Sequence, residues 1–353
     1  MTVRKAIVIP LASAHTELIL ATRFYESRVQ NVKHAIVLSI EIETEQIDDS
    51  PVTLHKIWMD QIYVYAATSI GLDVIDIETS NKVSYIDNIE GFTSVWSSED
   101  VVYLGTNDDG LKYIEKETIS GSESAPYNLE NNLKDYNYYY NTSSNQIKYL
   151  HGYNDTLAVV TGSGIDILNN TVNSFKSTTS NINVTKCFLT PANEIYYIVQ
   201  GTAEDDGIFK MNTVLCDWSN ADTSYKPGQS FIPEIADIND LFITTKTSKN
   251  NIDNTLFVAT TSGAYVFDEE EKSFDRYTTL LGEKYTALNT IYADLDSSRD
   301  NGKLYTTSSG NGAAFSIVDL DSKILYDSYT LTVKGRSGVT LEQEDIKDIN
   351  IGE

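Results

Sequence analysis

The stretch NTLFVATTSGAYVFDEEEKSFDRYTT, residues 254–279, contains two alternating apolar runs joined by a Thr-Thr-Ser-Gly turn, then an acidic turn and a third short run. Alternation of apolar and polar residues is typical of half-buried β-strands, and small polar residues with Gly are typical of the turns between them. The stretch therefore predicts an antiparallel hairpin followed by a third strand.

Related stretches recur along the chain. QIYVYAATSIGLDVIDIETSNKVSYID begins at Gln61, DVVYLGTNDDGLKYIEKETI at Asp100 and DTLAVVTGSGIDILNNTVNSFKSTT at Asp155, and more divergent copies begin at Glu194 and Gly302. In each copy one strand reaches a threonine before the turn; these are Thr68, Thr106, Thr161, Thr202, Thr260 and Thr307. Their mean spacing of about 48 residues is typical of β-propellers and not of helical or leucine-rich solenoids.

A degenerate first copy consists of AIVIPLAS, TELILATRF and HAIVLSIEIET, and each later copy follows one more apolar run, such as TLHKIWMD or INDLFITTKT. Seven units of four antiparallel strands predict an all-β fold, a seven-bladed β-propeller of four-stranded antiparallel blades. We expect one propeller domain over residues 1–330. Residues 331–353 either add a strand that closes the ring or dock on another subunit; Gly335 and Gly338 separate them from the last blade and favour docking.

VYLGTNDDGLKYIE and LFVATTSGAYVFDEEEKSFDRY resemble the repeats of the two-component regulator propellers, the sensor propellers of hybrid histidine kinases. In those repeats a strand ending in Gly-Thr is followed by a Gly-containing turn, an aromatic strand with a terminal Asp and a Phe-x-x-Tyr outer strand. The resemblance implies the fold and a sensor that binds a small molecule or saccharide. About 23 residues follow the seventh copy in place of kinase domains, so we expect a module in another setting.

Charge and composition restrict the classes of partner. With 26 Lys and Arg against 51 Asp and Glu, the formal net charge is −25, which disfavours nucleic acid and membrane surfaces and favours cations or a basic protein surface.

The longest apolar runs are shorter than a membrane helix requires. MTVRKAIVIPLASAH has signal-like features, but Pro10 interrupts its apolar stretch and we interpret it as a first strand. The chain is therefore expected to be soluble.

Catalytic chemistry is weakly indicated. His15, His34, His55 and His151 are scattered along the chain without metal-ligand spacing, and no GxSxG motif is present. Asp60, Asp237 and Asp240 lie near the first strands of blades, where acids can hold a central metal but more often line a water-filled channel. DLDSSRDNG carries Asp294, Asp296, Ser298 and Asp300 at alternate positions, yet Arg299 and Tyr305 replace the Gly and Glu of an EF-hand. We expect no enzyme, metal or cofactor.

The two cysteines, Cys187 and Cys216, are expected on the first and third strands of the fifth copy. One strand should separate them by about twice 4.8 Å, beyond the reach of a disulfide. We therefore predict that the two cysteines are free thiols and do not form a disulfide.

The most unusual composition is DYNYYYN, residues 135–141, within a long stretch from Ser124 to Gln146. Tyrosines offer rigid aromatic faces with polar tips and suit protein or carbohydrate partners, although packing as an outer strand of the third blade is the simpler interpretation. A second long stretch begins at Trp218. Candidate partner-binding residues are Tyr136, Tyr138, Tyr139, Tyr140, Trp218 and Tyr225.

Three functions follow. The first is a non-enzymatic interaction or structural propeller that binds other protein subunits of an assembly such as a virion, phage tail or surface appendage. The second is a ligand-binding sensor for a small molecule or saccharide. The third is a metal-dependent hydrolase or lactonase, which requires a bound divalent ion.

Overall fold

The structure is a computed structural model that describes the backbone of the chain in segments. These are residues 6–9, 16–26, 33–43, 54–79, 81–87, 91–122, 124–136, 142–154, 156–169, 174–177, 183–192, 194–200, 207–212, 238–248, 251–268, 273–276, 287–294, 303–308, 314–319 and 325–330. The described chain is all-β apart from two short 3-10 turns, η1 (Lys116–Thr118) and η2 (Glu130–Asn132). It forms two compact units, and each is described by itself.

The first unit contains three sheets. The first sheet has the order β1-β2-β3, the second β4-β5-β6-β7-β12-β11 and the third β8-β9-β10-β13. Their strands are β1 (Ala6–Ile9), β2 (Thr16–Glu26), β3 (Lys33–Glu43), β4 (Leu54–Met59), β5 (Tyr63–Thr68), β6 (Gly71–Asp76), β7 (Lys82–Asp87), β8 (Ser94–Ser97), β9 (Val101–Gly105), β10 (Leu111–Glu115), β11 (Gly121–Ser122), β12 (Ala125–Asn128) and β13 (Lys134–Asp135).

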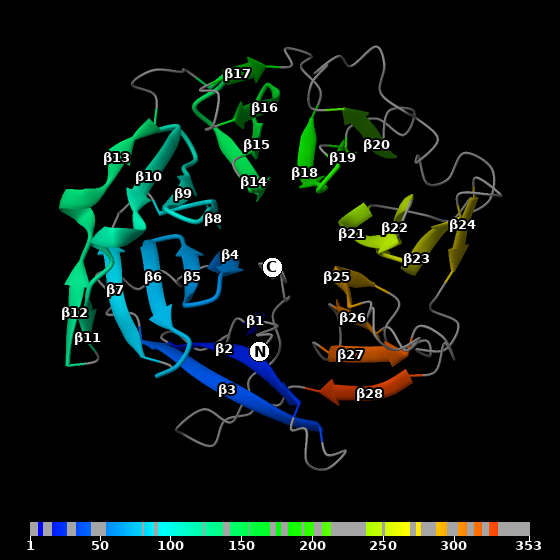
Figure 1. The fold of residues 1–353 in the computed structure, drawn as a ribbon, viewed down its shortest axis with the longest axis horizontal. Helices are drawn as coiled ribbons and strands as arrows, with labels where there is room; N and C mark the ends of the chain where they lie inside the picture. Colours follow the sequence, from blue (N-terminus) through cyan, green and yellow to red (C-terminus); the bar gives the residue numbers. More distant parts are fainter. Residues whose placement is uncertain are drawn as a thin grey trace. The chain divides into compact units, whose positions relative to one another are not determined.

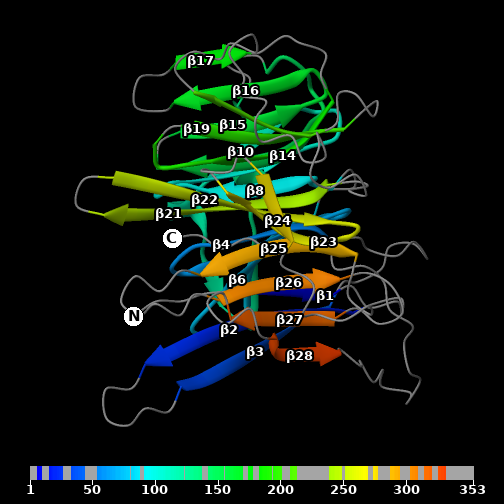
Figure 2. The same cartoon turned by 90° about the vertical axis from the view of Figure 1, so that its right-hand side faces the viewer.

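The second unit contains four sheets, each in simple sequence order. Figures 1 and 2 show the last of them, β25 to β28 in orange and red, as neighbouring antiparallel strands. The strands are β14 (Ile147–Tyr153), β15 (Thr156–Thr161), β16 (Gly164–Asn169), β17 (Ser174–Ser177), β18 (Val184–Leu189), β19 (Glu194–Val199), β20 (Gly207–Asn212), β21 (Ile238–Ser248), β22 (Asn251–Thr260), β23 (Gly263–Asp268), β24 (Ser273–Arg276), β25 (Leu288–Asp294), β26 (Lys303–Ser308), β27 (Ala314–Asp319) and β28 (Leu325–Thr330).

The apolar core lies between successive sheets. In the second unit one cluster joins Ile167 and Cys187, the next joins Ile198 and Leu241, and a third joins Ala259 and Ile291. Middle strands such as β5 are buried on both faces, which explains why they consist of nearly continuous apolar residues. Each such Val, Leu or Ile contributes roughly 1.5–3 kcal/mol through burial.

The threonine that ends the second strand of a copy closes the following turn. Thr68, Thr106, Thr161 and Thr260 are all buried, and each donates its hydroxyl to the carbonyl of the turn glycine over 2.8–3.3 Å. The same hydroxyl oxygen accepts a backbone N–H from inside the turn, as from Ser262 at 3.1 Å. The threonines are therefore turn-forming residues in four of the copies.

A glycine is required at the end of these turns. Gly71, Gly110, Gly164 and Gly263 have φ angles of 151°, 78°, 147° and 134°. Residues with a Cβ rarely adopt these values. Backbone geometry thus explains the glycine that follows the threonine by three residues in three of these turns and by four residues after Thr106.

The predicted all-β fold of mainly antiparallel sheets is confirmed, but the number of strands per sheet varies. Among the described residues, four sheets have the predicted four strands, the first and fifth have three, and the second has six. The second sheet has six strands because the chain leaves β10 and returns to this sheet, where β12 pairs in parallel with β7. The stretch from Ser124 was interpreted most simply as an outer strand of the third blade. Its first part, β12, instead joins the second sheet, whereas β13 pairs with β10 at the edge of the third sheet. Arrangement of the seven sheets as blades remains a prediction.

Candidate functional site

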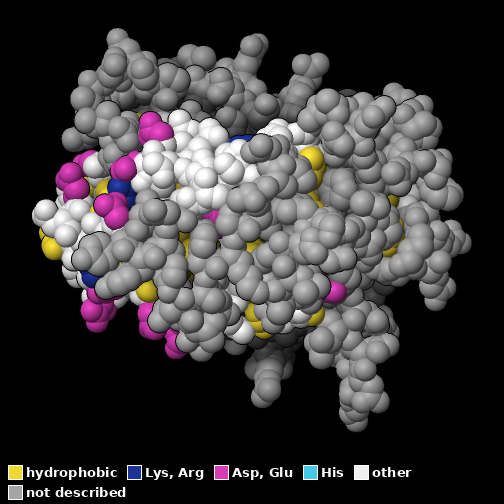
Figure 3. All heavy atoms as spheres, turned by 90° about the horizontal axis from the view of Figure 1, so that it is seen from above, with side chains coloured by type: hydrophobic (Ala, Val, Ile, Leu, Met, Phe, Trp, Pro, Cys, Tyr) yellow, Lys and Arg dark blue, Asp and Glu magenta, His cyan; other side chains and the backbone are white. Residues whose placement is uncertain are grey.

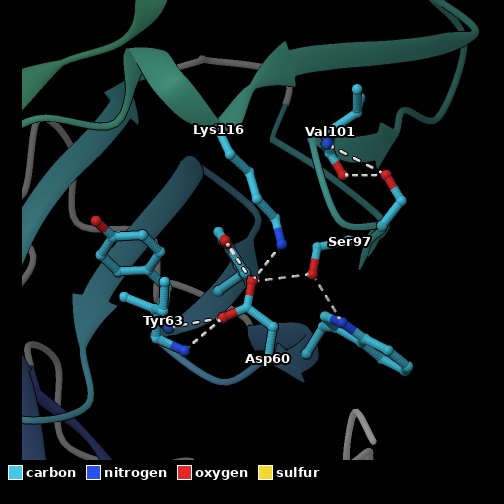
Figure 4. A network of polar contacts seen from close by, with 9 residues as sticks. Asp60, Tyr63, Ser97, Val101 and Lys116 are labelled. Carbon is cyan, nitrogen blue, oxygen red and sulfur yellow. Dashed lines mark hydrogen bonds and ion pairs between the residues drawn. The ribbon is translucent and has the colours of Figure 1, made fainter.

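The best-defined polar cluster of the first unit surrounds Asp60, immediately after β4 (Figure 4). Its Oδ1 accepts the backbone N–H groups of Ile62 and Tyr63, both at 2.8 Å. This contact closes the turn that leads into β5. Asp60 was predicted as one of three acids near the first strands, and the structure places it at the end of such a strand.

The other carboxylate oxygen of Asp60 contacts the third sheet. Oδ2 accepts Lys116 Nζ at 2.6 Å, Tyr65 Oη at 2.9 Å and Ser97 Oγ at 3.3 Å. Ser97 in turn accepts the indole N–H of Trp58 at 3.0 Å. The cluster therefore joins the second and third sheets through five donors on one carboxylate.

The electrostatics of the cluster agree with this role. Burial alone would raise the pKa of Asp60, but the hydrogen bond and charge of Lys116 and the two backbone N–H groups outweigh it and lower the pKa. Burial, followed by the charge of Asp60, raises the pKa of Tyr65. Asp60 is ionised and Tyr65 is neutral at ordinary pH. A carboxylate with five donors has little capacity left to hold a metal or accept a substrate proton.

The second predicted acid, Asp240 on β21, is 5% exposed. Its Oδ1 accepts Lys186 Nζ from β18 at 3.1 Å, and its Oδ2 accepts the backbone N–H of Ile291 from β25 at 3.1 Å. One side chain thus joins three successive sheets of the second unit. Asp237, the third predicted acid, lies outside the described residues.

Of the histidines, His151 is buried on β14. Its Nδ1 accepts the backbone N–H of Leu189 at 3.1 Å, and its ring lies 4.2 Å from that of Phe188. His151 therefore also joins two sheets, and His55 is exposed. The side chains of His15 and His34 lie outside the described part.

No group of three or more potential metal ligands occurs among the described side chains. The backbone of Asp294 ends β25, and Asp296, Ser298 and Asp300 of the candidate calcium loop lie outside the described residues. Cys187 is a buried thiol on β18, as predicted, while Cys216 lies outside the described chain.

Of the six candidate partner-binding residues, only Tyr136 is described. It follows β13, and its ring lies 5.7 Å from that of Tyr103 and 5.9 Å from that of Tyr113. Tyr136 is therefore half-buried against its own sheet, which agrees with the packing interpretation. Tyr138, Tyr139, Tyr140, Trp218 and Tyr225 lie outside the described residues, so their partner-binding role stays a prediction.

Sequence reasoning missed the partners of these acids. Lys116 lies beyond the third strand of the next copy, and Lys186 lies on the preceding copy. Neither lysine has a sequence signal that singles it out, because the pairs form only when the sheets pack. No helix among the described residues is long and apolar enough to cross a membrane.

No family model and no curated protein matches the chain. Among solved structures, the extracellular domain of a protein described as a one-component system from B. thetaiotaomicron matches with a TM-score of 0.50 at 12% identity, covering 95% of this chain and 47% of that chain. PorZ of Porphyromonas gingivalis, a bacterial surface component of the type-IX secretion system, matches with a TM-score of 0.52 at 12% identity, covering 92% and 47%.

A chain of the mitotic checkpoint complex matches with a TM-score of 0.54 at 12% identity, covering 84% of this chain and 81% of that chain. This chain spans about half the length of the two bacterial matches. At such low identity these similarities establish the fold class alone, an all-β protein with propeller-like neighbours. One neighbour is an extracellular domain that is also described as part of a hybrid two-component system, which is consistent with the resemblance found in the sequence.

Proposed function

We propose that this protein is a non-enzymatic β-propeller that acts as an interaction or structural subunit of a larger protein assembly, such as a virion, phage tail or surface appendage. Seven sheets follow one another along the chain, apart from the return of β11 and β12 to the second sheet, and this succession supports the propeller. The propeller-like neighbours cover 84–95% of the chain and support it further.

The observation that carries this proposal is that five hydrogen-bond donors of the chain already contact the Asp60 carboxylate. The acids near first strands were the best candidates for metal-dependent chemistry, and both described ones bind lysines and backbone N–H groups that hold sheets together. A hydrolase would need such a carboxylate available to a metal, a water molecule or a substrate. These contacts therefore favour a protein that binds partners through its surface over a metal-dependent hydrolase that uses these acids.

The charge of the surface indicates the kind of partner. Acidic side chains gather in the described part of the face that Figure 3 shows. Glu99, Asp100 and Glu117 are among the exposed acids of the first unit. A negative surface favours a basic protein partner and accelerates its encounter at low salt. Two neighbours are named as parts of protein systems, a secretion system and a checkpoint complex, and this supports an interaction role here.

The proposal is tested in the organism that makes the protein. Native extracts are separated by size at physiological and at high salt, and the mass of the fraction holding this chain is measured together with the stoichiometry of its partners. A fixed stoichiometry with one partner set, weakened by salt, is expected. A chain that migrates as a single copy in native extract at both salt concentrations would overturn the assembly role.

A further inference from the structure

Lys148 on β14 differs from five other lysines of the described chain, which form ion pairs. Lys82, Lys112, Lys116, Lys134 and Lys186 each contact a carboxylate within 3.3 Å. Lys148 Nζ instead donates to Oδ1 of Asn183, an uncharged acceptor, at 2.7 Å. Among the side chains that the structure describes, no carboxylate pairs with Lys148.

A partly buried ammonium without an anion is costly. Removal of water from Lys148 lowers its pKa, and no negative charge among the described residues opposes this effect. The chain carries 51 acids, so a carboxylate partner would be easy to supply. A lysine has three N–H donors, and Asn183 accepts one of them. The remaining donors point to a partner from outside the chain.

The position of Lys148 is fixed by a series of hydrogen bonds across three sheets. Asn183 Nδ2 donates to the carbonyl of Gln200 at 2.7 Å, and the N–H of Gln200 donates to the carbonyl of Asn183 at 3.0 Å. Gln200 Nε2 then donates to the carbonyl of Ile238 at 2.8 Å. The oxygen of Asn183 is thereby oriented toward Lys148, and little side-chain freedom is lost when a ligand binds.

The site lies where the first strands of three sheets begin. Lys148 is the second residue of β14, Asn183 directly precedes β18, and Ile238 begins β21. Asn183 is exposed, whereas Lys148 is partly buried. The hydrogen bond between the two side chains is therefore exposed to solvent.

We propose that Lys148 is the contact point of a binding site for a carboxylate-bearing ligand, with Asn183 as its positioning residue. One lysine supplies one positive charge and matches a monoanionic carboxylate. The overall negative charge of the chain does not prevent this, because charges on the surface are screened over about 8 Å at physiological ionic strength. The carboxylate can come from an acidic sugar or from a peptide. The site does not depend on the proposed assembly role.

The test follows backbone amide resonances of the full chain during titration with three probes. Glucuronate and N-acetylglycine carry the carboxylate in a sugar and in a peptide setting, and glucose is the uncharged control. We expect saturable shifts at Asn183 and Gln200 for one or both carboxylates, with a dissociation constant of about 1 mM, and no shift with glucose. Binding of only one carboxylate identifies the sugar or the peptide as the source.

Two variants test whether Lys148 binds the carboxylate. Lys148→Gln removes the charge and should weaken binding at least about tenfold, the loss expected for one charged hydrogen bond. Lys134→Gln removes one charge from an exposed lysine that is already paired with Glu115, and should bind as the parent does. Absence of saturable shifts with both carboxylates, equal shifts with glucose, or unchanged binding by a folded Lys148→Gln variant would each overturn the site. Any of these results leaves the assembly role untouched.

Discussion

Lys116 Nζ lies 2.6 Å from Asp60 Oδ2, although the two residues are 56 positions apart in the sequence. The side chains are 18% and 17% exposed. The pair connects the turn after β4 with the 3-10 turn that follows β10, and therefore the second sheet with the third. A residue that looked suited to chemistry thus contributes to the cohesion of the first unit.

Replacement of Asp60 by Asn should destabilise the protein by about 3 kcal/mol, because Lys116 then stays buried without its anion. The free energy of unfolding in urea measures the effect. The control is Asp135→Asn, since Asp135 is 69% exposed and also pairs with a lysine at 2.6 Å. Exposed pairs contribute at most about 1 kcal/mol. An equal, small loss in both variants would show that the Asp60 cluster does not hold the sheets.

The pH dependence of stability should separate Asp60 from Asp73. The pKa of Asp60 is lowered in the folded protein, so its contribution is present above the unfolded pKa of about 3.9 and is lost as the pH falls through the folded value. Burial raises the pKa of Asp73, and Lys82 only partly opposes it. As the pH falls, the folded state binds a proton at Asp73 first, and stability from this group rises.

Unfolding free energies of Asp60→Asn, Asp73→Asn and the parent between neutral pH and about pH 3 test these signs. The difference between the parent and Asp60→Asn should shrink toward acid. The Asp73→Asn variant should lose a stabilisation that the parent gains on acidification. Parallel profiles for all three proteins would contradict both assignments.

The threonine turns can be tested within a single turn. Thr260→Val keeps the shape of the side chain but removes the hydroxyl that bonds the carbonyl of Gly263 and the N–H of Ser262. We expect a loss of about 1–3 kcal/mol, because Thr260 is fully buried and its partners lose their bonds. The neighbouring Thr261→Val should change stability by less than about 0.5 kcal/mol. Similar losses for both residues would contradict the role of Thr260.

The parallel strand β12 should depend on Leu129, which is fully buried and donates its N–H to the carbonyl of Tyr85 at 2.8 Å. Leu129→Ala should cost about 2–5 kcal/mol and increase hydrogen exchange at β12 and β7. Tyr127→Ala is the control, since Tyr127 is 43% exposed on the same strand. Unchanged exchange at β7 in Leu129→Ala would show that β12 does not cover this edge.

Most strands could be predicted from the sequence because their signals are local. The buried middle strands are short apolar runs, and Thr and Gly mark the turns between them, as Thr161 and Gly164 do between β15 and β16. β12 could not be predicted, because APYN has no alternation and its partner β7 belongs to another copy. The partners of Asp60 and Lys148 were hidden for the same reason, since packing between sheets brings them together.

One domain over residues 1–330 predicts a single cooperative unfolding transition, and two probes can follow it in urea. Trp58 and Trp96, 6% and 3% exposed, report on the first unit by fluorescence, and Cys187, 2% exposed, reports on the second by its reactivity with a thiol reagent. Trp218→Phe and Cys216→Ser confine the signals to these residues, because the chain has 3 Trp and 2 Cys. A single propeller predicts coincident midpoints and slopes. Separate midpoints for fluorescence and thiol labelling would show two independent domains and contradict the propeller.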